Sequence, residues 1–465
     1  MHLTAHAPAA APLHQHLDGL IYQARAAQQV FESFDQAQVD AIVKDFGRYV
    51  YDHARPLSEL AVQETGIGVL EDKVAKKIGK SRAIWNSLKH APSRGIIGED
   101  HDRQLLLVAK PMGVVGAVTP VTNPVVTPMC NAMFALKAGN AVIFAPHPKA
   151  QRCAEHLTEA YRKILVRHGA PADLVQTVRG ADVPMTQALM RQVDVVIATG
   201  GSAMVKAAYS SGRPSLGVGA GNVQVIIDRD VDLPAALGKI VAGAAFDNGI
   251  ICSHEQFVLV HRDDLPAAEA ALRAMDHVCY LEDNAAADAI RQVLFVEGKI
   301  NREVVGRSCA HIGGLAGLAI PERTRVIALR ARGVAGQDII AREKLCPVIG
   351  LLPYATFEEA VALAKANLLL EGAGHTAGLH SDNATRIAYA GIHLPVSRLV
   401  VNQTCSTSAG GSLTNGLAPT TTLGCGSWGN NSISENLDFK HLMNISRIAK
   451  VITHRAPVTD EQIWN

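Results

Sequence analysis

The sequence predicts an α/β protein made of two units, each built on a parallel sheet. The chain has 465 residues, more than a single hydrophobic core normally organises. From about residue 105 onward, short apolar strands alternate with helices, which is the pattern of βαβ units. A second series of the same kind begins at Gln256. We therefore expect two α/β units, with a boundary near residue 228.

The chain is predicted to be helical from about Leu17 to Ala91, and an α/β series follows. Apolar residues recur at three- and four-residue spacing over Phe31–Ala54 and Leu57–Lys89. In the series that follows, each apolar strand leads into a helix. These predicted pairs are the strand 113–118 with the helix 124–137, the strand 141–144 with the helix 151–167, and the strand 193–198 with the helix 203–210.

The second α/β series follows the strand 223–227 and a helix over 234–245. Its apolar strands are predicted at 256–260, 326–329, 348–352, 377–380 and 398–402. Two segments with alternating apolar residues, 104–109 and about 441–452, lie outside both series. The alternation alone does not show which sheet these two segments join.

Composition argues against several classes of protein. Hydrophobic residues make up 48% and charged residues 19%, as in a globular protein. A net charge of +1, with no basic run between aromatic residues, predicts neither a nucleic-acid nor a membrane partner. No signal-like run and no apolar stretch of about 18 residues is present, so the cytoplasm is expected. Eight cysteines without a Cys-x-x-Cys pair predict neither a metal site nor a disulfide framework.

One of these cysteines, Cys252, is a candidate nucleophile. It lies between a turn preceded by glycine and the apolar strand 256–260, where a thiolate could be held rigidly at a strand edge. The alternative interpretation for any one of eight cysteines is a buried structural side chain.

Two glycine-containing segments could contact a dinucleotide. The segment 199–202 follows an apolar strand and opens a helix, whose free N–H groups could face a pyrophosphate. The segment 217–221 precedes a strand instead, which is the wrong context for the ordinary Rossmann fingerprint.

Taken together, these motifs resemble the aldehyde dehydrogenase superfamily over nearly all of Leu57–Lys450. The resemblance rests on the stretch 248–256 around Cys252, on the glycine loop 215–222, and on 118–124, which contains a Thr-Pro-x-x-Asn-Pro pattern. The glycine-rich run 423–436 is similar to the aldehyde dehydrogenase half of bifunctional aldehyde–alcohol dehydrogenases. Because the chain ends at Asn465, we expect no alcohol dehydrogenase half.

The resemblance implies an aldehyde dehydrogenase-like fold with two Rossmann-like domains and a small bridging sheet used for oligomer contacts. Residues 1–227 would hold the N-terminal helices and the dinucleotide-binding domain, with 104–109 in the bridging sheet. Residues 228–425 would form the catalytic cysteine domain, and 426–465 the C-terminal return and oligomerisation segment. A homodimer or homotetramer is expected.

The resemblance also implies roles for individual residues. Cys252 would be the nucleophile, and Asn123 would hold the oxyanion, although Asn123 could instead cap the helix that follows Pro124. Glu343, in a Glu-x-x-x-Pro pattern, would hold the nicotinamide ribose, although its charged neighbours also fit a solvated surface residue. His375 is a candidate proton handler. Further residues expected at the NAD or NADP site are Thr119, Pro120, His147, Thr199, Gly200, Gly201, Ser202, Gly217, Val218 and Gly219.

Gly217 stands where hydrolytic members of the superfamily carry a glutamate that activates water. Its absence points to the CoA-acylating branch, because the thiol of CoA is more acidic and more nucleophilic than water. Glu255 lies three residues beyond Cys252, but the direction of the strand would point it away from the sulfur. The predicted reaction is the reversible, NAD- or NADP-dependent oxidation of an aldehyde to an acyl-CoA through a Cys252 thioacyl-enzyme.

The loop 403–415 is rich in hydroxyl groups and suits a short or polar aldehyde. Acetaldehyde fits this description, and so does sulfoacetaldehyde, although no arginine lies in the loop to hold a sulfonate. A hydrolytic aldehyde dehydrogenase and a cysteine hydrolase are the alternative enzymes, and a non-catalytic homologue is the alternative outside catalysis.

Overall fold

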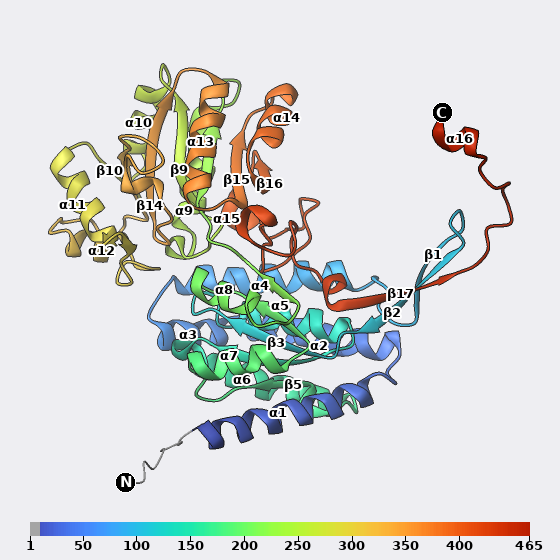
Figure 1. Ribbon diagram of the computed structural model, residues 1–465. Helices are drawn as coiled ribbons and strands as arrows, with labels where there is room; N and C mark the ends of the chain where they lie inside the picture. The colour runs from blue at the N-terminus through green and yellow to red at the C-terminus, as the bar shows by residue number, and fades with distance from the viewer. Residues whose placement is uncertain (1–9) are drawn as a thin grey trace, which may run out of the picture.

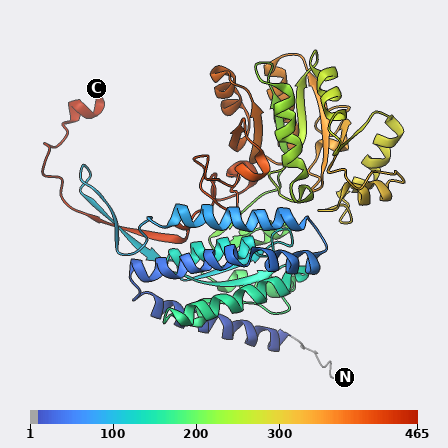
Figure 2. The same ribbon diagram turned by 180° about the vertical axis from the view of Figure 1, so that it is seen from behind.

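The computed structural model describes residues 10–465 and contains two parallel sheets and a small antiparallel sheet (Figure 1). The first parallel sheet has five strands in the order β5-β4-β3-β6-β7, and the second has seven in the order β10-β13-β14-β9-β8-β15-β16. Figures 1 and 2 show the two sheets as separate layers, with helices on both sides of each. The predicted α/β fold class with two parallel sheets is confirmed.

The first sheet is built from continuously buried strands, as the apolar runs predicted. All residues of β3 and β4 are buried, because helices cover both faces. The strands are β3 (Val114–Thr119), β4 (Ala141–Pro146), β5 (Val175–Thr177), β6 (Val195–Ala198) and β7 (Ser215–Gly217). The helices that follow them are α5 (Val126–Lys137), α6 (Gln151–Arg167), α7 (Val183–Gln192) and α8 (Ser202–Tyr209).

Four helices precede this sheet, where the sequence predicted two long ones. They are α1 (Ala10–Phe31), α2 (Gln36–Asp52), α3 (Ala54–Thr65) and α4 (Leu70–Leu88). The predicted helix 57–89 is wrong as a single element, because Gly66 ends α3 with a left-handed φ of 69° and Gly68 has a φ of 84°. The predicted start at Phe31 is also wrong, because Asp35 starts a new helix through a capping box with Gln38.

The second sheet begins one strand earlier than the predicted boundary. Its strands are β8 (Val223–Ile227), β9 (Glu255–His261), β10 (Val278–Leu281), β13 (Val326–Arg330), β14 (Val348–Tyr354), β15 (Gly374–His380) and β16 (Val396–Val401). The strand β8 pairs in parallel with β9 on one side and β15 on the other. The chain therefore changes sheets between residues 217 and 223, upstream of the boundary predicted near 228.

Helices cover both faces of this second sheet, and two hydrophobic clusters fill the space beneath them. The helices are α9 (Leu233–Ala245), α10 (Leu265–Arg273), α11 (Asn284–Leu294), α12 (Cys309–Leu315), α13 (Phe357–Leu370), α14 (Ala384–His393) and the short α15 (Cys405–Ser408). A two-stranded hairpin, β11 (Phe295–Val296) with β12 (Lys299–Ile300), lies after α11.

The antiparallel sheet joins β1 (Ile96–Asp100), β2 (Leu105–Pro111) and β17 (Met443–Ala449). The two segments predicted to lie outside both series thus pair with each other, and Figure 1 shows them as an arm projecting from the body, followed by α16 (Asp460–Trp464). Leu437, Leu442 and Met443 pack into the core of the first sheet, so the C-terminal return is anchored to the N-terminal half. Within residues 10–465, no helix is long and apolar enough to cross a membrane.

Candidate active site

The residues expected at the dinucleotide lie together at one edge of the first sheet. They follow the carboxyl ends of β4, β3, β6 and β7, which are neighbours in the sheet. Backbone hydrogen bonds connect these ends: His147 N donates to Thr119 O at 3.0 Å, and Thr199 N donates to Val118 O at 3.1 Å. Ligands of open α/β sheets bind at this edge, where successive crossovers diverge from a central strand.

This edge fits a dinucleotide in two respects. The segment 199–201 is half-buried to exposed and leads into α8, whose first N–H groups have no side-chain cap in the part of the chain described. His147 and Lys149 are exposed beside it, at the end of β4. Backbone donors and two basic side chains therefore meet at a single open edge.

Cys252 lies between this edge and the second sheet, just before β9. The turn before it has three consecutive residues with left-handed backbone: Asp247 (φ 53°), Asn248 (φ 55°) and Gly249 (φ 62°). Residues other than glycine rarely adopt this conformation, so surrounding contacts must hold the turn. On the other side, a Cβ added at Gly221 would lie 2.0 Å from the Cys252 carbonyl oxygen. The glycine loop therefore packs directly against the backbone of the candidate nucleophile.

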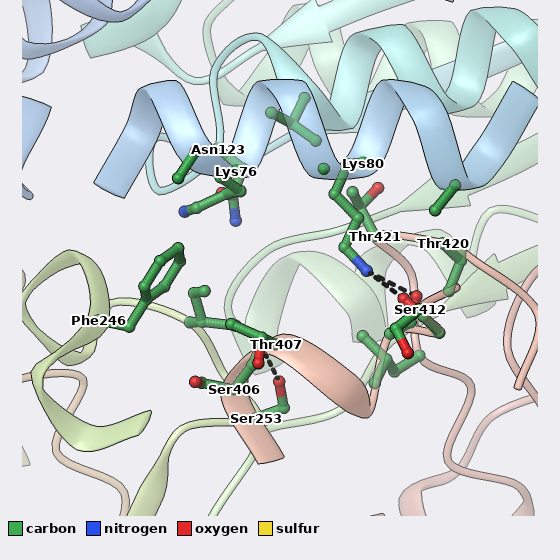
Figure 3. Close-up of a pocket in the computed structure, with 18 of the residues that line it drawn as sticks. Lys76, Lys80, Asn123, Phe246, Ser253, Ser406, Thr407, Ser412, Thr420 and Thr421 are labelled. Carbon is green, nitrogen blue, oxygen red and sulfur yellow. Dashed lines mark hydrogen bonds between the residues drawn. The ribbon is translucent and has the colours of Figure 1, made fainter. Parts of the chain in front are cut away.

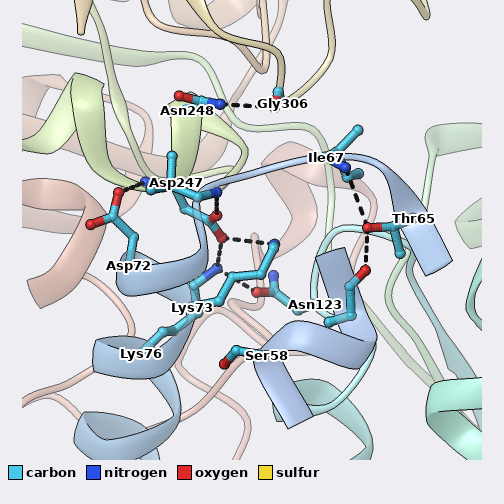
Figure 4. A network of polar contacts seen from close by, with 12 residues as sticks. Ser58, Thr65, Ile67, Asp72, Lys73, Lys76, Asn123, Asp247, Asn248 and Gly306 are labelled. Atoms are coloured by element: carbon cyan, nitrogen blue, oxygen red, sulfur yellow. Dashed lines mark hydrogen bonds and ion pairs between the residues drawn. The ribbon is translucent and has the colours of Figure 1, made fainter. Parts of the chain in front are cut away.

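A buried ion-pair network holds the turn from the opposite side (Figure 4). The carboxylate of Asp247 accepts hydrogen bonds from Lys76 Nζ at 2.6 Å, Lys73 Nζ at 3.1 Å and Val69 N at 2.7 Å. Burial would raise the pKa of Asp247, but Lys76 and Lys73 outweigh burial and lower it. Asp247 N in turn donates to Asp72 Oδ2 at 2.8 Å. All four partners lie in the first two turns of α4 or just before it, so this helix fixes the cysteine turn.

The same network reaches Asn123. Lys76 Nζ also donates to Asn123 Oδ1, at 2.8 Å. The helix α5 begins at Val126, and no side chain caps its first turn, so the helix-cap interpretation of Asn123 is wrong for its side chain. Because an ammonium group can only donate, it fixes the amide with its oxygen toward Lys76 and leaves the NH₂ group free to donate elsewhere.

Cys252 and Asn123 both line a cavity of about 370 Å³. Figure 3 shows this cavity, with Asn123 beside Lys76. One wall is a face of α4, with Lys76 and Lys80, and the opposite wall is the hydroxyl-rich segment 406–414. The loop predicted to border the aldehyde pocket therefore does line the cavity at Cys252. Among residues 10–465, no aspartate, glutamate or histidine lines it.

The absence of a base that could activate water is seen in the residues of the cavity wall, more directly than in Gly217. A Cβ added at Gly217 would lie 2.8 Å from Val205 Cγ1 and 3.0 Å from Tyr209 Cε2, both on α8. The glycine of this loop that touches Cys252 is Gly221. Glu255 is buried away from the cavity and accepts a hydrogen bond from Cys405 N at 2.6 Å.

Glu343 lies beside the cysteine loop and is half-buried. Its Oε1 accepts a hydrogen bond from Gly221 N at 2.9 Å. Burial raises the pKa of Glu343 to about 8, and the neighbouring Glu371 adds to the shift. Burial likewise raises the pKa of the Cys252 thiol to about 12, with a further contribution from Glu343. A solvated surface position does not describe Glu343, which belongs to the surroundings of Cys252.

His375 and the neighbour of the cysteine loop, His254, are buried and do not line the cavity. His375 lies on β15, where its Nδ1 is 3.0 Å from Thr376 Oγ1, and burial lowers its pKa to about 3. His254 Nδ1 lies 2.7 Å from the Ile251 carbonyl oxygen. A role of His375 in proton handling stays a prediction.

Sequence reasoning missed the lysines of α4. Lys73, Lys76 and Lys80 recur at three- and four-residue spacing, which places them along one side of the helix. Such a row of lysines on a predicted helix normally indicates a solvated face, and their buried partners lie more than 150 residues away in sequence. In the part of the chain that the structure describes, no cluster of three His, Cys, Asp or Glu side chains could hold a metal ion, and all eight cysteines are free.

Comparison with known proteins identifies the family. The sequence model described as "Aldehyde dehydrogenase family" matches residues 5–279, more than half of the chain. The chain belongs to the aldehyde dehydrogenase family. This confirms the resemblance inferred from the motifs around Cys252, Asn123 and the glycine loop.

Several members of the family that resemble this chain are named as acylating or bifunctional enzymes. The succinate-semialdehyde dehydrogenase (acetylating) of Clostridium kluyveri is 51% identical over 445 residues, which cover 96% of this chain and 98% of that protein. The bifunctional aldehyde-alcohol dehydrogenase of Escherichia coli is 36% identical over 451 residues, covering 95% of this chain and 50% of that protein. The family resemblance thus extends over almost the entire sequence.

Solved structures of the family share the whole fold. An acetylating aldehyde dehydrogenase from Geobacillus thermoglucosidasius has a TM-score of 0.92 at 33% identity, covering 96% of this chain and 99% of that one. A propionaldehyde dehydrogenase from Rhodopseudomonas palustris, crystallised with bound CoA and an acylated cysteine, has a TM-score of 0.83 at 26% identity and covers 93% of this chain and 97% of that one.

Proposed function

We propose that this enzyme oxidises a short, polar aldehyde to an acyl-CoA with NAD or NADP, reversibly and through a thioacyl intermediate on Cys252. The observation that carries the proposal is the cavity in which Cys252 and Asn123 meet. It lies beside a dinucleotide-binding edge, and within residues 10–465 no carboxylate lines it that could activate water. The acetylating relative that matches 96% of this chain supports the same reaction.

The first step is addition of the Cys252 thiolate, after the thiol has lost its proton to the water of the cavity, to the aldehyde carbon, and the π electrons of the carbonyl pass to its oxygen. The alkoxide that forms needs hydrogen-bond donors already in place. Asn123 supplies its NH₂ group, because Lys76 holds the oxygen of the same amide. The Cys252 N–H is the second donor. The buried ion pairs of Asp247 then keep the cysteine turn and Asn123 at a fixed separation, since Lys76 contacts both.

The cofactor would lie along the carboxyl edge of the first sheet, over Thr119, His147 and the segment 199–202, with Gly217, Val218 and Gly219 at the next strand end. When bound, NAD or NADP accepts the hydride that leaves the substrate carbon. Glu343, held toward Cys252 through the Gly221 N–H, is placed to bind the nicotinamide ribose from the side of the second sheet.

The residues of the cavity wall determine which nucleophile releases the acyl group from Cys252. Water needs a base to attack a thioester, and the described wall carries neither a carboxylate nor a histidine. The thiolate of CoA needs less assistance and forms the new carbon–sulfur bond as the bond to Cys252 breaks. One thioester replaces another, so the reaction can run in both directions. A cysteine hydrolase is disfavoured on the same ground, because it needs a histidine within reach of the sulfur.

Dependence on CoA tests this function. Without CoA, the enzyme should release at most one burst of reduced cofactor per active site, because the thioacyl-enzyme persists in water. Addition of CoA should restore steady turnover, with an acyl-CoA as product. Stopped-flow absorbance at 340 nm measures the burst, and mass spectrometry identifies the product. Sustained formation of free carboxylic acid without CoA would instead assign the chain to the hydrolytic enzymes.

We further propose that the enzyme is a homodimer or homotetramer whose subunits meet at the antiparallel sheet. The C-terminal segment after β17 extends from this arm (Figure 1), and it contains exposed large apolar side chains. Val451 is 81% exposed and Trp464 is 82% exposed. A second copy of the chain that packs on this arm would cover them. Eight free cysteines support a reducing compartment, the cytoplasm, as its location.

Removal of residues 451–465 should lower the mass measured by analytical ultracentrifugation, from a dimer to a monomer or from a tetramer to a smaller species. The reason is that the segment contributes no buried side chain to its own subunit. A matched control is Val183→Ser, which removes an apolar side chain that is 56% exposed elsewhere on the surface. Full-length protein that is already monomeric at micromolar concentration, or a truncated form that keeps its mass class, would contradict the proposed interface.

A further inference from the structure

The cavity at Cys252 contains a cation without an acidic partner. Lys80 Nζ donates to two backbone carbonyl oxygens, Gly410 O at 2.7 Å and Gly411 O at 3.1 Å (Figure 3). Within the described chain it forms no ion pair, whereas Lys76 and Lys73 share the carboxylate of Asp247. Backbone carbonyls satisfy hydrogen bonds but do not neutralise the charge. Lys80 therefore leaves a net positive charge at the wall of the substrate cavity.

Lys80 is half-buried, so its charge is partly desolvated and is costly unless something compensates it. Burial lowers the pKa of Lys80 to about 8, and Lys76 adds a smaller lowering. A negatively charged ligand in the cavity would supply the missing partner. A lysine that lines a substrate cavity and has no carboxylate partner in the protein is expected where the substrate itself carries the negative charge.

The residue types of the cavity lining agree with a polar ligand. Ser406, Ser412, Thr414 and Thr421 all line the cavity, and Ser412 belongs to the loop that Lys80 contacts. Serine and threonine hydroxyl groups can donate to an acceptor oxygen, so this lining suits a ligand with several such oxygens.

The spacing of Lys76 and Lys80 on α4 indicates how a ligand is oriented in the cavity. Lys76, which contacts Asn123, is one helical turn before Lys80, or about 6 Å along the axis. An aldehyde whose carbonyl meets Cys252 and Asn123 would thus direct its far end toward Lys80. A short carbon chain suits this spacing.

We propose that Lys80 binds the anionic end of the substrate, so that this enzyme acts on short aldehydes that carry a carboxylate or sulfonate group. This rests on the proposed aldehyde oxidation and specifies its substrate class. The hydroxyl-rich loop first suggested a polar aldehyde, and α4 supplies the cation that the loop lacks.

Matched pairs of aldehydes test the assignment. The ratio of kcat/KM for 4-oxobutanoate to that for butanal should exceed 10 in the wild-type enzyme, and it should fall by about 10- to 100-fold in Lys80→Met, as for the loss of one hydrogen bond to a charged group. Lys80→Arg should retain most of the preference. Arg82→Gln, which removes an exposed cation from the same helix outside the cavity, should leave the ratio unchanged. Sulfoacetaldehyde against acetaldehyde distinguishes a sulfonate from a carboxylate.

The outcomes distinguish the proposed anion site at Lys80 from the proposed oxidation of aldehydes. If Lys80→Met lowers both members of a pair equally, Lys80 only fastens the loop at Gly410, and the proposal is overturned. A wild-type ratio near 1 overturns it as well, while CoA-dependent turnover of butanal would still support aldehyde oxidation. Should Lys80→Met fail to fold, inhibition of wild-type butanal oxidation decides: succinate should compete with butanal and succinamide should not, and equal inhibition would count against an anion site.

Discussion

Replacement of Cys252 with alanine should abolish aldehyde oxidation, with a loss of turnover of about 10⁴-fold or more, as for the removal of other covalent nucleophiles. The residue lines the cavity and is half-buried, so the change removes the attacking sulfur and little packing. Reduced cofactor formed at saturating aldehyde and CoA is the measurement, and the thermal unfolding midpoint verifies the fold. Cys279→Ala, at another half-buried cysteine on β10, is the matched control.

A Cys252→Ala protein that is folded and still oxidises aldehyde would remove this residue from the mechanism. Loss of activity in Cys279→Ala as well would indicate that thiol loss acts through stability. Intact-mass spectrometry adds a direct observation, since wild-type enzyme incubated with an acyl-CoA should gain one acyl group per chain and the alanine variant none.

Asn123→Ala should lower kcat by about 10²- to 10³-fold, the usual effect of deleting one donor to an oxyanion. The structure supplies the reason, because Lys76 fixes the amide oxygen and leaves the NH₂ group as the free end. Lys76→Met should cause a smaller loss of kcat, since it frees the amide without deleting it. Steady-state rates over a range of aldehyde concentrations separate kcat from KM. Asn284→Ala, an exposed residue at the start of α11, provides the control.

An Asn123→Ala enzyme that loses less than about threefold in kcat would exclude this side chain from the oxyanion site, where larger losses are usual. A change confined to KM would instead assign it to ground-state binding of the aldehyde.

The regular parts of the fold were predictable because their burial leaves a local pattern. The strand 223–227 is buried at every position and the helix 151–167 is amphipathic, and both were predicted with the limits that the structure has. The helix predicted over 57–89 was not interrupted at Gly66, because a single glycine in an amphipathic pattern does not specify a left-handed cap. The strand 96–100 escaped prediction, since its pairing with β2 leaves no buried side chain.

The sequence predicted those residues of the candidate site that stand in motifs, but not the residues that hold them in place. Cys252, Asn123 and Glu343 were recognised from short local patterns. The residues that hold them, Lys76 and Asp247, form contacts across 171 positions of sequence, and neither stands in a motif. Lys80 was overlooked for the same reason, because an inward-facing lysine and a solvated one look alike in a helical pattern. What the sequence could not convey was which face of α4 turns toward the second sheet.

The left-handed turn before Cys252 also bears on how this active site could be reused. The residues from Asp247 to Gly249 adopt a backbone that their own sequence does not favour, and the lysines that stabilise it come from a helix more than 170 residues earlier in the chain. The peptide around the cysteine is therefore not a portable module. A designer who grafts it onto another scaffold must also provide a helix bearing two buried ammonium groups, or the loop will relax to an ordinary conformation and carry its thiol away from the carbonyl.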